Sequence, residues 1–347
     1  MPIDDRKQKI MMAIVSLYAN GGEPVGSNLL SHYFNLSVSS ATLRNEMAAL
    51  TKLGMLEQPH TSAGRVPTPK GYRYYVDHLL DRPATLPLEQ KQKIDGIVNA
   101  LDYDPEKLAR GAAVQLADLL GYAMVATTPL AKDLYIAHYE VIQVGRYSAA
   151  VLAVTVAGGV LTRVAKVDFE LDANDAQRLA ATLNAHLRFV AEADVSSQLI
   201  RSMVDSLAEA GPRCWPILSA ALTLLAEAGK PSVYFEGQQY LLQWPELENG
   251  MRHLLQLVAD REQMEALLQP NTEGTLVIFG DELQEQPIPG LCIVSRHYHA
   301  GGGLKGVIAA LGPTRMRFSE VIPTIEYFSE LMGKAVSAAG SDARPPR

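Results

Sequence analysis

The first 70 residues constrain the fold most strongly, because turn-forming residues divide them into short segments of different periodicity. Residues 4–19 carry apolar side chains at helical spacing, so they predict a first helix. The stretch "NGGEP" at 20–24 ends it, since Asn and Gly accept left-handed conformations and Pro does not continue a helix. A short second helix is predicted at 27–33 and a third at about 40–53, which ends at Gly54.

A small β-hairpin is predicted directly after these helices. The stretch "MLEQPHTSAGRVPT" at 55–68 has two short apolar edges around a Ser-Ala-Gly tip. Three helices and a hairpin within 70 residues form the layout of a winged helix-turn-helix. A further helix at 69–80 follows, and the prolines of "DRPATLPL" indicate a linker.

The rest of the chain predicts strands, then helices, then strands again. Helices are expected at about 88–101 and 105–120, before strands at 122–127, 133–144, 147–157 and 159–169. A mostly helical region at 173–270, interrupted at 233–237, precedes strands at 274–280, 290–299 and 303–312 and a closing helix at 318–335. This order favours an α+β fold, one sheet domain with a helical insertion. Residues 338–347 read as a disordered tail.

Composition indicates a soluble cytoplasmic protein. The chain has 347 residues, of which 48% are hydrophobic and two are cysteines, far apart and in no metal-binding pattern. A disulfide framework is not expected, and a reducing compartment is. The first residues place acids before a basic cluster, unlike a signal peptide, and the apolar run at 149–161 is too short to span a bilayer.

The net charge of −7 hides an asymmetry between the two ends of the chain. Residues 1–82 contain nine Lys and Arg against seven Asp and Glu, while the remainder contains 22 against 31. A mildly positive N-terminal region on an acidic body is compatible with an anionic partner for that region. The excess is small and does not by itself identify the partner.

The predicted helix at 40–53 has one apolar and one polar face. Leu43, Met47 and Leu50 share the apolar face, which should pack on the first two helices. The other face carries Arg44 and Asn45 among small alanines, so bulky side chains do not keep its backbone away from a DNA groove. Arg binds guanine and Asn binds adenine with paired hydrogen bonds.

Backbone contacts are expected from residues around that face. Ser39 and Ser40 stand at the helix N-terminus, where free N–H groups favour a phosphate, and Thr42 and Lys52 flank the polar face. A plain structural alternative exists for this helix alone: alanines are good helix formers, Asn45 is solvated and the serines only cap. The neighbouring short helix and hairpin favour the DNA-reading interpretation, because the second helix of such a pair enters the groove.

The hairpin and the next helix add further candidate contacts. His60 and Thr61 lie on one arm and Arg65 follows the Gly64 turn, so the tip can approach the DNA backbone or a narrow minor groove. A tight turn with a solvated arginine is the alternative. Lys70 and Arg73 could hold phosphates, whereas the nearby tyrosines fit core packing.

Several stretches closely resemble the family of bacterial heat-inducible transcription repressors HrcA. They are "EPVGSNLL", "SSATLRNEM", "LGMLEQPHTSAGRVPTPKGYRYYVD" and "GPTRMRF". The resemblance covers nearly the whole chain and is most specific at 23–77. After "GPTRM" this chain has Arg317-Phe318, where the family is expected to have an acid and an aromatic residue.

The resemblance implies an architecture and a function. It implies a winged-helix DNA-binding domain at 1–82, a discontinuous GAF-like domain at 83–190 and 271–337, and an inserted dimerisation domain at 191–270. The implied function is negative regulation of chaperonin and chaperone operons. A homodimer would bind an inverted-repeat operator at the nucleoid and would be released when heat stress titrates away the chaperonin GroEL.

Other classes of function find less support in the sequence. His297 and His299 face the same side of a predicted strand but have no third ligand at motif spacing, so no metal site is expected. The stretch "AGGGLKG" lacks the context and ending of a phosphate loop, and no catalytic set is evident, so we expect neither a cofactor nor an enzyme. The main alternative is a winged-helix regulator controlled by a small molecule bound in its GAF-like domain.

Overall fold

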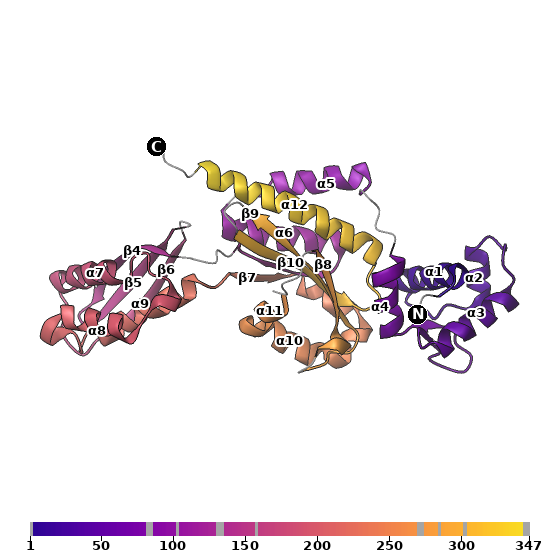
Figure 1. The fold of residues 1–347 in the computed structure, drawn as a ribbon, viewed down its shortest axis with the longest axis horizontal. Coiled ribbons are helices and arrows are strands. Elements are labelled where there is room, and N and C mark those ends of the chain that lie inside the picture. The colour runs from indigo at the N-terminus through magenta and orange to yellow at the C-terminus, as the bar shows by residue number, and fades with distance from the viewer. Residues whose placement is uncertain are drawn as a thin grey trace. The chain divides into compact units, whose positions relative to one another are not determined.

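The computed structural model divides the chain into two compact units (Figure 1). It describes residues 3–80, 86–101, 104–129, 135–156, 159–268, 274–283, 286–300 and 304–342. Unit 1 consists of Met1–Thr128, Val233–Gly301 and Gly306–Arg347, and unit 2 of Pro129–Ser232 with Gly302–Lys305. Within unit 1 we call residues 3–80 the head and the remainder the body.

The head contains the helices and the hairpin predicted from the sequence, in the predicted order. Its elements are α1 (Asp5–Gly21), α2 (Ser27–Tyr33), α3 (Ser40–Lys52), β1 (Leu56–Glu57), β2 (Val66–Pro67), α4 (Pro69–Tyr74) and a π-helical turn, η1 (Tyr75–Leu79). Asp4 caps α1 by accepting a hydrogen bond from the Lys7 N–H, as expected of an N-cap aspartate. Ile14, Leu30 and Leu43 are fully buried between the three helices. Of these three, Leu43 lies on the helix face that the sequence predicted to pack on the first two helices.

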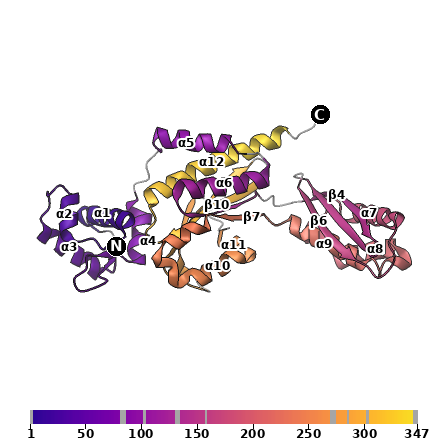
Figure 2. The ribbon, with the colours of Figure 1, turned by 180° about the vertical axis from the view of Figure 1, so that it is seen from behind.

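The body is a five-stranded sheet with helices on both faces. The strands are β3 (Ala123–Thr127), β7 (Val233–Glu236), β8 (Thr275–Phe279), β9 (Leu291–Ala300) and β10 (Leu304–Pro313), in the order β7-β3-β10-β9-β8. The helices are α5 (Leu88–Asn99), α6 (Pro105–Leu120), α10 (Met251–Ala259), α11 (Arg261–Leu268) and α12 (Phe318–Asp342), with short 3-10 turns η4 (Gln238–Gln243), η5 (Pro245–Gly250) and η6 (Gly280–Glu282). Helices α6 and α12 cover one face, and α5 packs on α12 (Figure 2).

Alternation along the strands builds a core on each face of this sheet. Val125, Ile293 and Ala309 belong to a cluster with Leu254 of α10 and Met264 of α11. Their neighbours along the strands point to the opposite face, because successive residues of a strand face opposite sides. The sheet is therefore buried on both faces.

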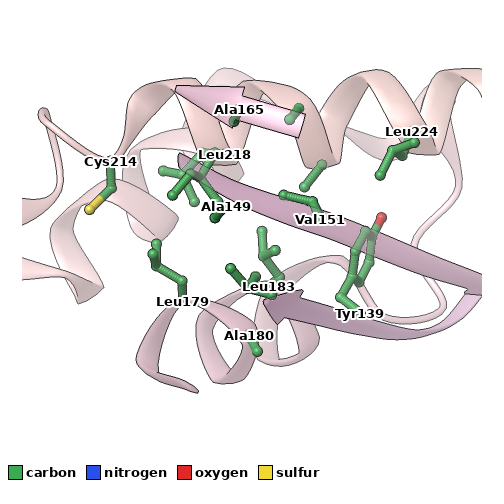
Figure 3. Packing of buried hydrophobic residues seen from close by; sticks show 14 of the residues in the cluster. Tyr139, Ala149, Val151, Ala165, Leu179, Ala180, Leu183, Cys214, Leu218 and Leu224 are labelled. Carbon is green, nitrogen blue, oxygen red and sulfur yellow. The ribbon is translucent and has the colours of Figure 1, made fainter. Parts of the chain in front are cut away.

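Unit 2 is a three-stranded antiparallel sheet with helices on one face. Its elements are β4 (Ile136–Gly145), β5 (Ser148–Thr155), β6 (Val160–Lys166), α7 (Ala173–Leu187), η2 (Glu192–Asp194), α8 (Ser197–Ser206), η3 (Ala208–Ala210) and α9 (Trp215–Ala228). Figure 3 shows Tyr139, Ala149 and Val151 of the sheet packed between Leu183 of α7 and Leu218 of α9. Along β5 every second residue is buried, and Ala149, Val151 and Ala153 belong to this cluster.

The division of the chain differs from the one expected from the sequence. It falls at 128/129 and 232/233, not at 190/191 and 270/271. Among the described residues, strands β4 to β6 pair only with one another, whereas β7 pairs with β3 of the body. The periodicity of a strand shows that it is a strand but not which distant strand it pairs with.

Two other expectations concern the end of the chain and the membrane. Helix α12 continues through Asp342, so the first five residues of the expected tail are helical, and 343–347 lie outside the described residues. Within the described residues, no helix combines the length and the apolar character needed to cross a bilayer.

Candidate nucleic-acid interface

A tight turn joins α2 to α3 and fixes their relative orientation. Asn35 and Leu36 have positive φ angles of 51° and 59°. Asn accepts this conformation readily, but for Leu it is strained. The Leu36 N–H donates to the Ser31 carbonyl at 2.9 Å, and the Ser31 hydroxyl donates to the Val38 carbonyl at 2.9 Å. The surrounding hydrogen bonds thus hold a strained turn in place.

Hydroxyl groups organise the N-terminus of α3. Ser39 is the N-cap, and its Oγ accepts a hydrogen bond from the Thr42 N–H at 3.1 Å. The Ser40 hydroxyl donates to Asn28 Oδ1 at 2.8 Å and lies 2.9 Å from Ser27 Oγ, both at the start of α2. The first turns of the two helices are therefore joined beside a helix end that attracts anions.

The two faces of α3 are as predicted. Leu43, Met47 and Leu50 are buried. Arg44, Asn45 and Lys52 are exposed, as is Ala41, while Ala48 is half-buried. Among the described residues, neither Arg44 nor Asn45 has a hydrogen-bond or ion-pair partner, so both side chains are available to a ligand.

Glu46, the acidic residue of α3, forms ion pairs with two basic residues of α1. Lys7 Nζ lies 3.2 Å from Glu46 Oε2, and Arg6 Nη1 lies 3.9 Å from Glu46 Oε1. Hydrogen bonds to Asp4 and then to Glu46 raise the pKa of Lys7. The pairing of Lys7 with Glu46 could not be predicted from the sequence, since opposite charges 39 positions apart carry no local signal. Their pairing removes a negative charge that would oppose a phosphate.

The hairpin differs in detail from the prediction. The turn is closed by the Ala63 N–H, which donates to the His60 carbonyl at 2.8 Å, and the Gln58 amide donates to the Thr61 and Ala63 carbonyls. The exposed tip therefore includes His60 and Thr61 but not Gly64. A Cβ on Gly64 would lie 2.3 Å from the Val25 carbonyl carbon. The absence of a side chain at Gly64 lets the hairpin backbone pack closely against the connection between α1 and α2.

Arg65 lies at the base of the hairpin, where it contacts α3. Its backbone pairs with Val25 in both directions at 2.9 Å, which adds a third strand segment to the hairpin. Its Nε donates to Thr51 Oγ1 at 3.1 Å, and the residue is half-buried. Arg65 thus lies beside the last turn of α3. The role of Thr51 could not be predicted from the sequence, because its hydroxyl accepts a hydrogen bond from Arg65 only when the hairpin folds back on α3.

Lys70 and Arg73 follow the hairpin on α4 but have different surroundings. Lys70 is exposed, and its Nζ donates to the Leu53 carbonyl at 2.8 Å, at the C-terminus of α3. Arg73 is bound by Glu282 and by the Val277 carbonyl, and its guanidinium lies 4.8 Å from the centre of the Phe279 ring. In this structure Arg73 therefore joins the head to the body and is not grouped with the polar face of α3.

The structure brings most of the predicted residues to one helix and its ends. Arg65 and Lys70 contact the C-terminal end of α3, and His60 and Thr61 form the hairpin tip. The remaining candidates lie on or directly before α3 itself: Ser39, Ser40, Thr42, Arg44, Asn45 and Lys52. A helix with exposed, unpaired Arg and Asn side chains and an anion-attracting N-terminus can bind a nucleic acid in a sequence-dependent way.

The body also carries an open hollow of about 550 Å3 between β9 and α12. Arg296, His297, His299 and Lys334 contribute to its lining, together with Glu330. Among the described residues there is no group of three or more His, Cys, Asp or Glu side chains that could hold a metal ion. The lining of the hollow thus carries two cations, Arg296 and Lys334, and one carboxylate, Glu330.

Comparison with known proteins identifies the family. The family model of the HrcA protein C-terminal domain matches residues 106–322. A protein of Desulforudis audaxviator is 33% identical over 344 residues, which cover 97% of this chain and 98% of that protein. A protein of Carboxydothermus hydrogenoformans is 31% identical over 336 residues, which cover 96% of this chain and 98% of that protein.

Both relatives are described as transcription repressors, and specifically as Heat-inducible transcription repressor HrcA. A solved crystal structure described as a hypothetical protein has a TM-score of 0.62 to this chain at 25% identity, and covers 97% of this chain and 99% of its own. The chain belongs to the family of heat-inducible transcription repressors HrcA. The resemblance seen in the sequence is thereby confirmed.

Proposed function

We propose that the head is a winged helix-turn-helix domain that binds double-stranded DNA with α3 in the major groove. The observation that carries this proposal is the exposure of Arg44 and Asn45 on a helix whose start, flank and end are all fixed to the rest of the head. A fixed helix positions both side chains against base edges without a large loss of entropy on binding. Alanines beside them let the helix backbone approach the bases.

Each candidate residue has a role in this proposal. Arg44 and Asn45 read base edges, and Ser39, Ser40 and Thr42 bind phosphate at the helix N-terminus. Lys52, Arg65 and Lys70 contact the backbone near the other end of α3, and His60 and Thr61 approach it from the hairpin tip. Arg73 stays outside this set, because Glu282 binds its guanidinium.

A homodimer completes the proposal, since two heads related by a two-fold axis explain an inverted-repeat operator. The body would be the GAF-like domain and unit 2 the inserted dimerisation domain. What supports the role of unit 2 is the face of its sheet opposite α7 and α9. Ile142, Ala150 and Val164 are direct cross-strand neighbours on that face, and Ile142 and Val164 are 45% and 62% exposed. The next cross-strand row of the same face carries Glu140 and Thr162, so these residues form an exposed apolar strip on a mixed face. An exposed apolar strip of this kind is typical of an interaction site.

The regulatory part of the proposal rests on family membership. The repressor would silence chaperonin and chaperone operons at the nucleoid of the cytoplasm. Heat-unfolded proteins would occupy the chaperonin GroEL, and repressor without chaperonin would lose its active form. Marginal stability of a folded protein makes such a sensor physically reasonable.

A gel-shift experiment at defined salt tests the DNA-binding part. The probe is the inverted repeat upstream of a chaperonin operon, and the reference is a scrambled duplex. Wild type should prefer the repeat, and Arg44→Ala should reduce that preference by about 1–3 kcal/mol, the value of a bidentate base contact. Lys52→Ala is the matched control, because loss of a phosphate contact weakens binding to both duplexes similarly. A wild type without preference, even with chaperonin present, would contradict the repressor function.

A small-molecule-controlled regulator is the second candidate, and the hollow between β9 and α12 favours it. A small anion bound there would contact Lys334 and Arg296, of which Arg296 already pairs with Glu326. A metabolite that binds there should raise the melting temperature of the purified protein and change its affinity for DNA. A chaperonin-dependent repressor should instead gain DNA binding when chaperonin is added, with no such ligand present.

A further inference from the structure

Arg315 of the body reaches the C-terminus of α1 in the head. It follows β10 in the stretch "GPTRMRF", and its side chain is only 14% exposed. Its Nη1 donates to the Ala19 carbonyl at 3.4 Å, while its Nε donates to Glu246. The guanidinium also lies 4.7 Å from the centre of the Trp244 ring. One side chain thus joins α1 to the η4–η5 segment of the body.

The end of α1 is shaped to receive this guanidinium. Gly22 caps the helix in the left-handed conformation, with φ of 70°, and its N–H donates to the Tyr18 carbonyl at 2.8 Å. A Cβ at Gly22 would lie 3.2 Å from Arg315 Nη2, so the glycine leaves the space that the arginine uses. The C-terminus of a helix carries a partial negative charge and favours a cation at this position.

The body holds Arg315 rigidly on its other side. The Trp244 ring stacks on Tyr122 at 5.8 Å with an interplanar angle of 16°. A Cβ on Gly290 would lie 2.5 Å from the Glu246 carbonyl oxygen, so the backbone of Glu246 is closely packed. Glu246 Oε2 is buried and has no hydrogen-bond partner in the described part of the chain. Its charge is therefore balanced mainly by Arg315.

Helix α1 connects this contact to α3. Its 17 residues span about 25 Å at 1.5 Å per residue. Lys7, in its first turn, pairs with Glu46 of α3. A displacement of the C-terminal end of α1 would therefore be transmitted to the helix that carries Arg44 and Asn45.

A second attachment between head and body lies at α4 and the first residue of η1. Tyr72 and Tyr75 pack against Phe318, and Tyr72 also packs against Phe279, with ring centroids 6.2 to 6.4 Å apart. A single attachment at α4 would still let the head rotate about it. Arg315 adds a contact on a different helix, and two contacts on different helices fix the orientation.

We propose that Arg315, held by Glu246 and Trp244, is a positioning residue for DNA binding: it fixes the orientation of the head and so the distance at which a dimer reads two half-sites. This inference rests on the proposed function, because only a dimer with two DNA-binding heads has a spacing preference. Arg315 makes no contact with DNA in this scheme. It acts through α1.

The test uses the full-length chain and a series of duplexes. The half-site is taken from the duplex that wild type selects from a random pool, and the inverted half-sites are then separated by zero to five additional base pairs. Each added base pair rotates one half-site by about 34°, since one turn of DNA takes about 10.5 base pairs. Dissociation constants are measured for every spacing and for a single half-site. Thermal unfolding of each variant shows whether it is folded.

Two measurements distinguish an effect on the orientation of the head from damage to the head itself: the preference for one spacing and the affinity for a single half-site. Wild type should bind its preferred spacing at least about tenfold more tightly than a spacing three base pairs longer, and Arg315→Ala should reduce this ratio to below about threefold. Affinity for the single half-site should stay within about twofold, because the reading face is unchanged. Arg315→Lys keeps a cation at the helix end and should retain part of the ratio. Arg317→Ala is the matched control, because Arg317 directly precedes α12 and pairs with Glu320 in the first turn of that helix, and it should behave like wild type.

Other outcomes would overturn the proposal in distinguishable ways. If Arg315→Ala keeps the spacing preference of wild type, the positioning role is wrong and the dimeric repressor stands. If Arg315→Ala also loses the single half-site, the residue maintains the head itself and does not orient it. If Arg317→Ala loses the spacing preference equally, the loss of a positive charge in this region explains the result, and the contact of Arg315 with α1 does not. A wild type that shows no spacing preference would overturn the proposed dimer, and this inference with it.

Discussion

Ser39 and Thr42 are joined twice at the start of α3. The Thr42 N–H donates to Ser39 Oγ at 3.1 Å, and the two hydroxyl oxygens lie 2.9 Å apart. Ser39 is exposed, so the same oxygen that caps the helix is also within reach of a bound phosphate. Capping alone and capping with phosphate binding make different predictions for substitutions at this position.

Replacing Ser39 by alanine and by aspartate separates the two roles. Ser39→Ala removes the cap and should lower the free energy of unfolding of the head by about 1 kcal/mol. Ser39→Asp restores a good cap and adds a negative charge that the helix N-terminus favours, so stability should stay near that of wild type. The added charge should repel phosphate and weaken operator binding by roughly tenfold. Thermal unfolding and gel-shift titration of both variants measure these effects. Wild-type DNA affinity in Ser39→Asp would show that α3 does not approach DNA with its N-terminus.

Gly64 should tolerate no larger side chain. A Cβ there would lie 2.3 Å from the Val25 carbonyl carbon and 2.7 Å from the Gly26 nitrogen, and both are backbone atoms that cannot move alone. Gly64→Ala should therefore cost about 1–3 kcal/mol of head stability and should displace the hairpin, with loss of operator binding. Gly21→Ala is the control, since a Cβ at Gly21 meets no atom within 4 Å. It should leave both the melting temperature and DNA binding unchanged or slightly raise the former.

The open sheet face of unit 2 predicts a way to separate the dimer without unfolding the chain. Val164 is 62% exposed on that face, so Val164→Glu should leave the fold of unit 2 intact. In a dimer formed through this face, the buried carboxylate would be strongly unfavourable. Analytical ultracentrifugation at micromolar concentration should then detect monomers. Gln177→Glu adds the same charge at an exposed position of α7, on the other side of unit 2, and should remain dimeric. Equal association of both variants would mean that the dimer uses another surface.

Local periodicity predicted the elements of the head but not all of its contacts. The spacing of Leu43, Met47 and Leu50 was sufficient to assign the buried face of α3, because a helix repeats every 3.6 residues. The position of Arg65 was not predictable in this way. It depends on the approach of Gly64 to Val25, which brings together segments 39 residues apart.

The division into units shows the same limit over a longer range. Strands β3 and β4 are close in sequence, yet β3 pairs with β7 and β10, more than 100 residues later. The alternating pattern of β4 and β5 fits a sheet covered on one face, but it does not say which strands are their neighbours. Which sheet they join depends on long-range pairing and on α7 and α9, whose apolar faces cover them. Similarly, Arg73 resembled a phosphate ligand because Glu282, its partner, lies 209 residues away.

The two cysteines should report separately on the opening of the two units. Cys292 of β9 in the body and Cys214 before α9 in unit 2 are both free and buried. Burial raises the pKa of both thiols above the usual value of 9.0, so the folded state keeps their protons where the unfolded state would lose them. The free energy of unfolding should therefore fall as the pH rises through about 9. At neutral pH and moderate temperature neither thiol should react with a disulfide reagent, since the thiolate is the reactive form. Single-cysteine variants, Cys214→Ala and Cys292→Ala, heated in steps with reagent present, should show the temperature at which each unit opens. Rapid modification of either thiol in the unheated protein would contradict its burial.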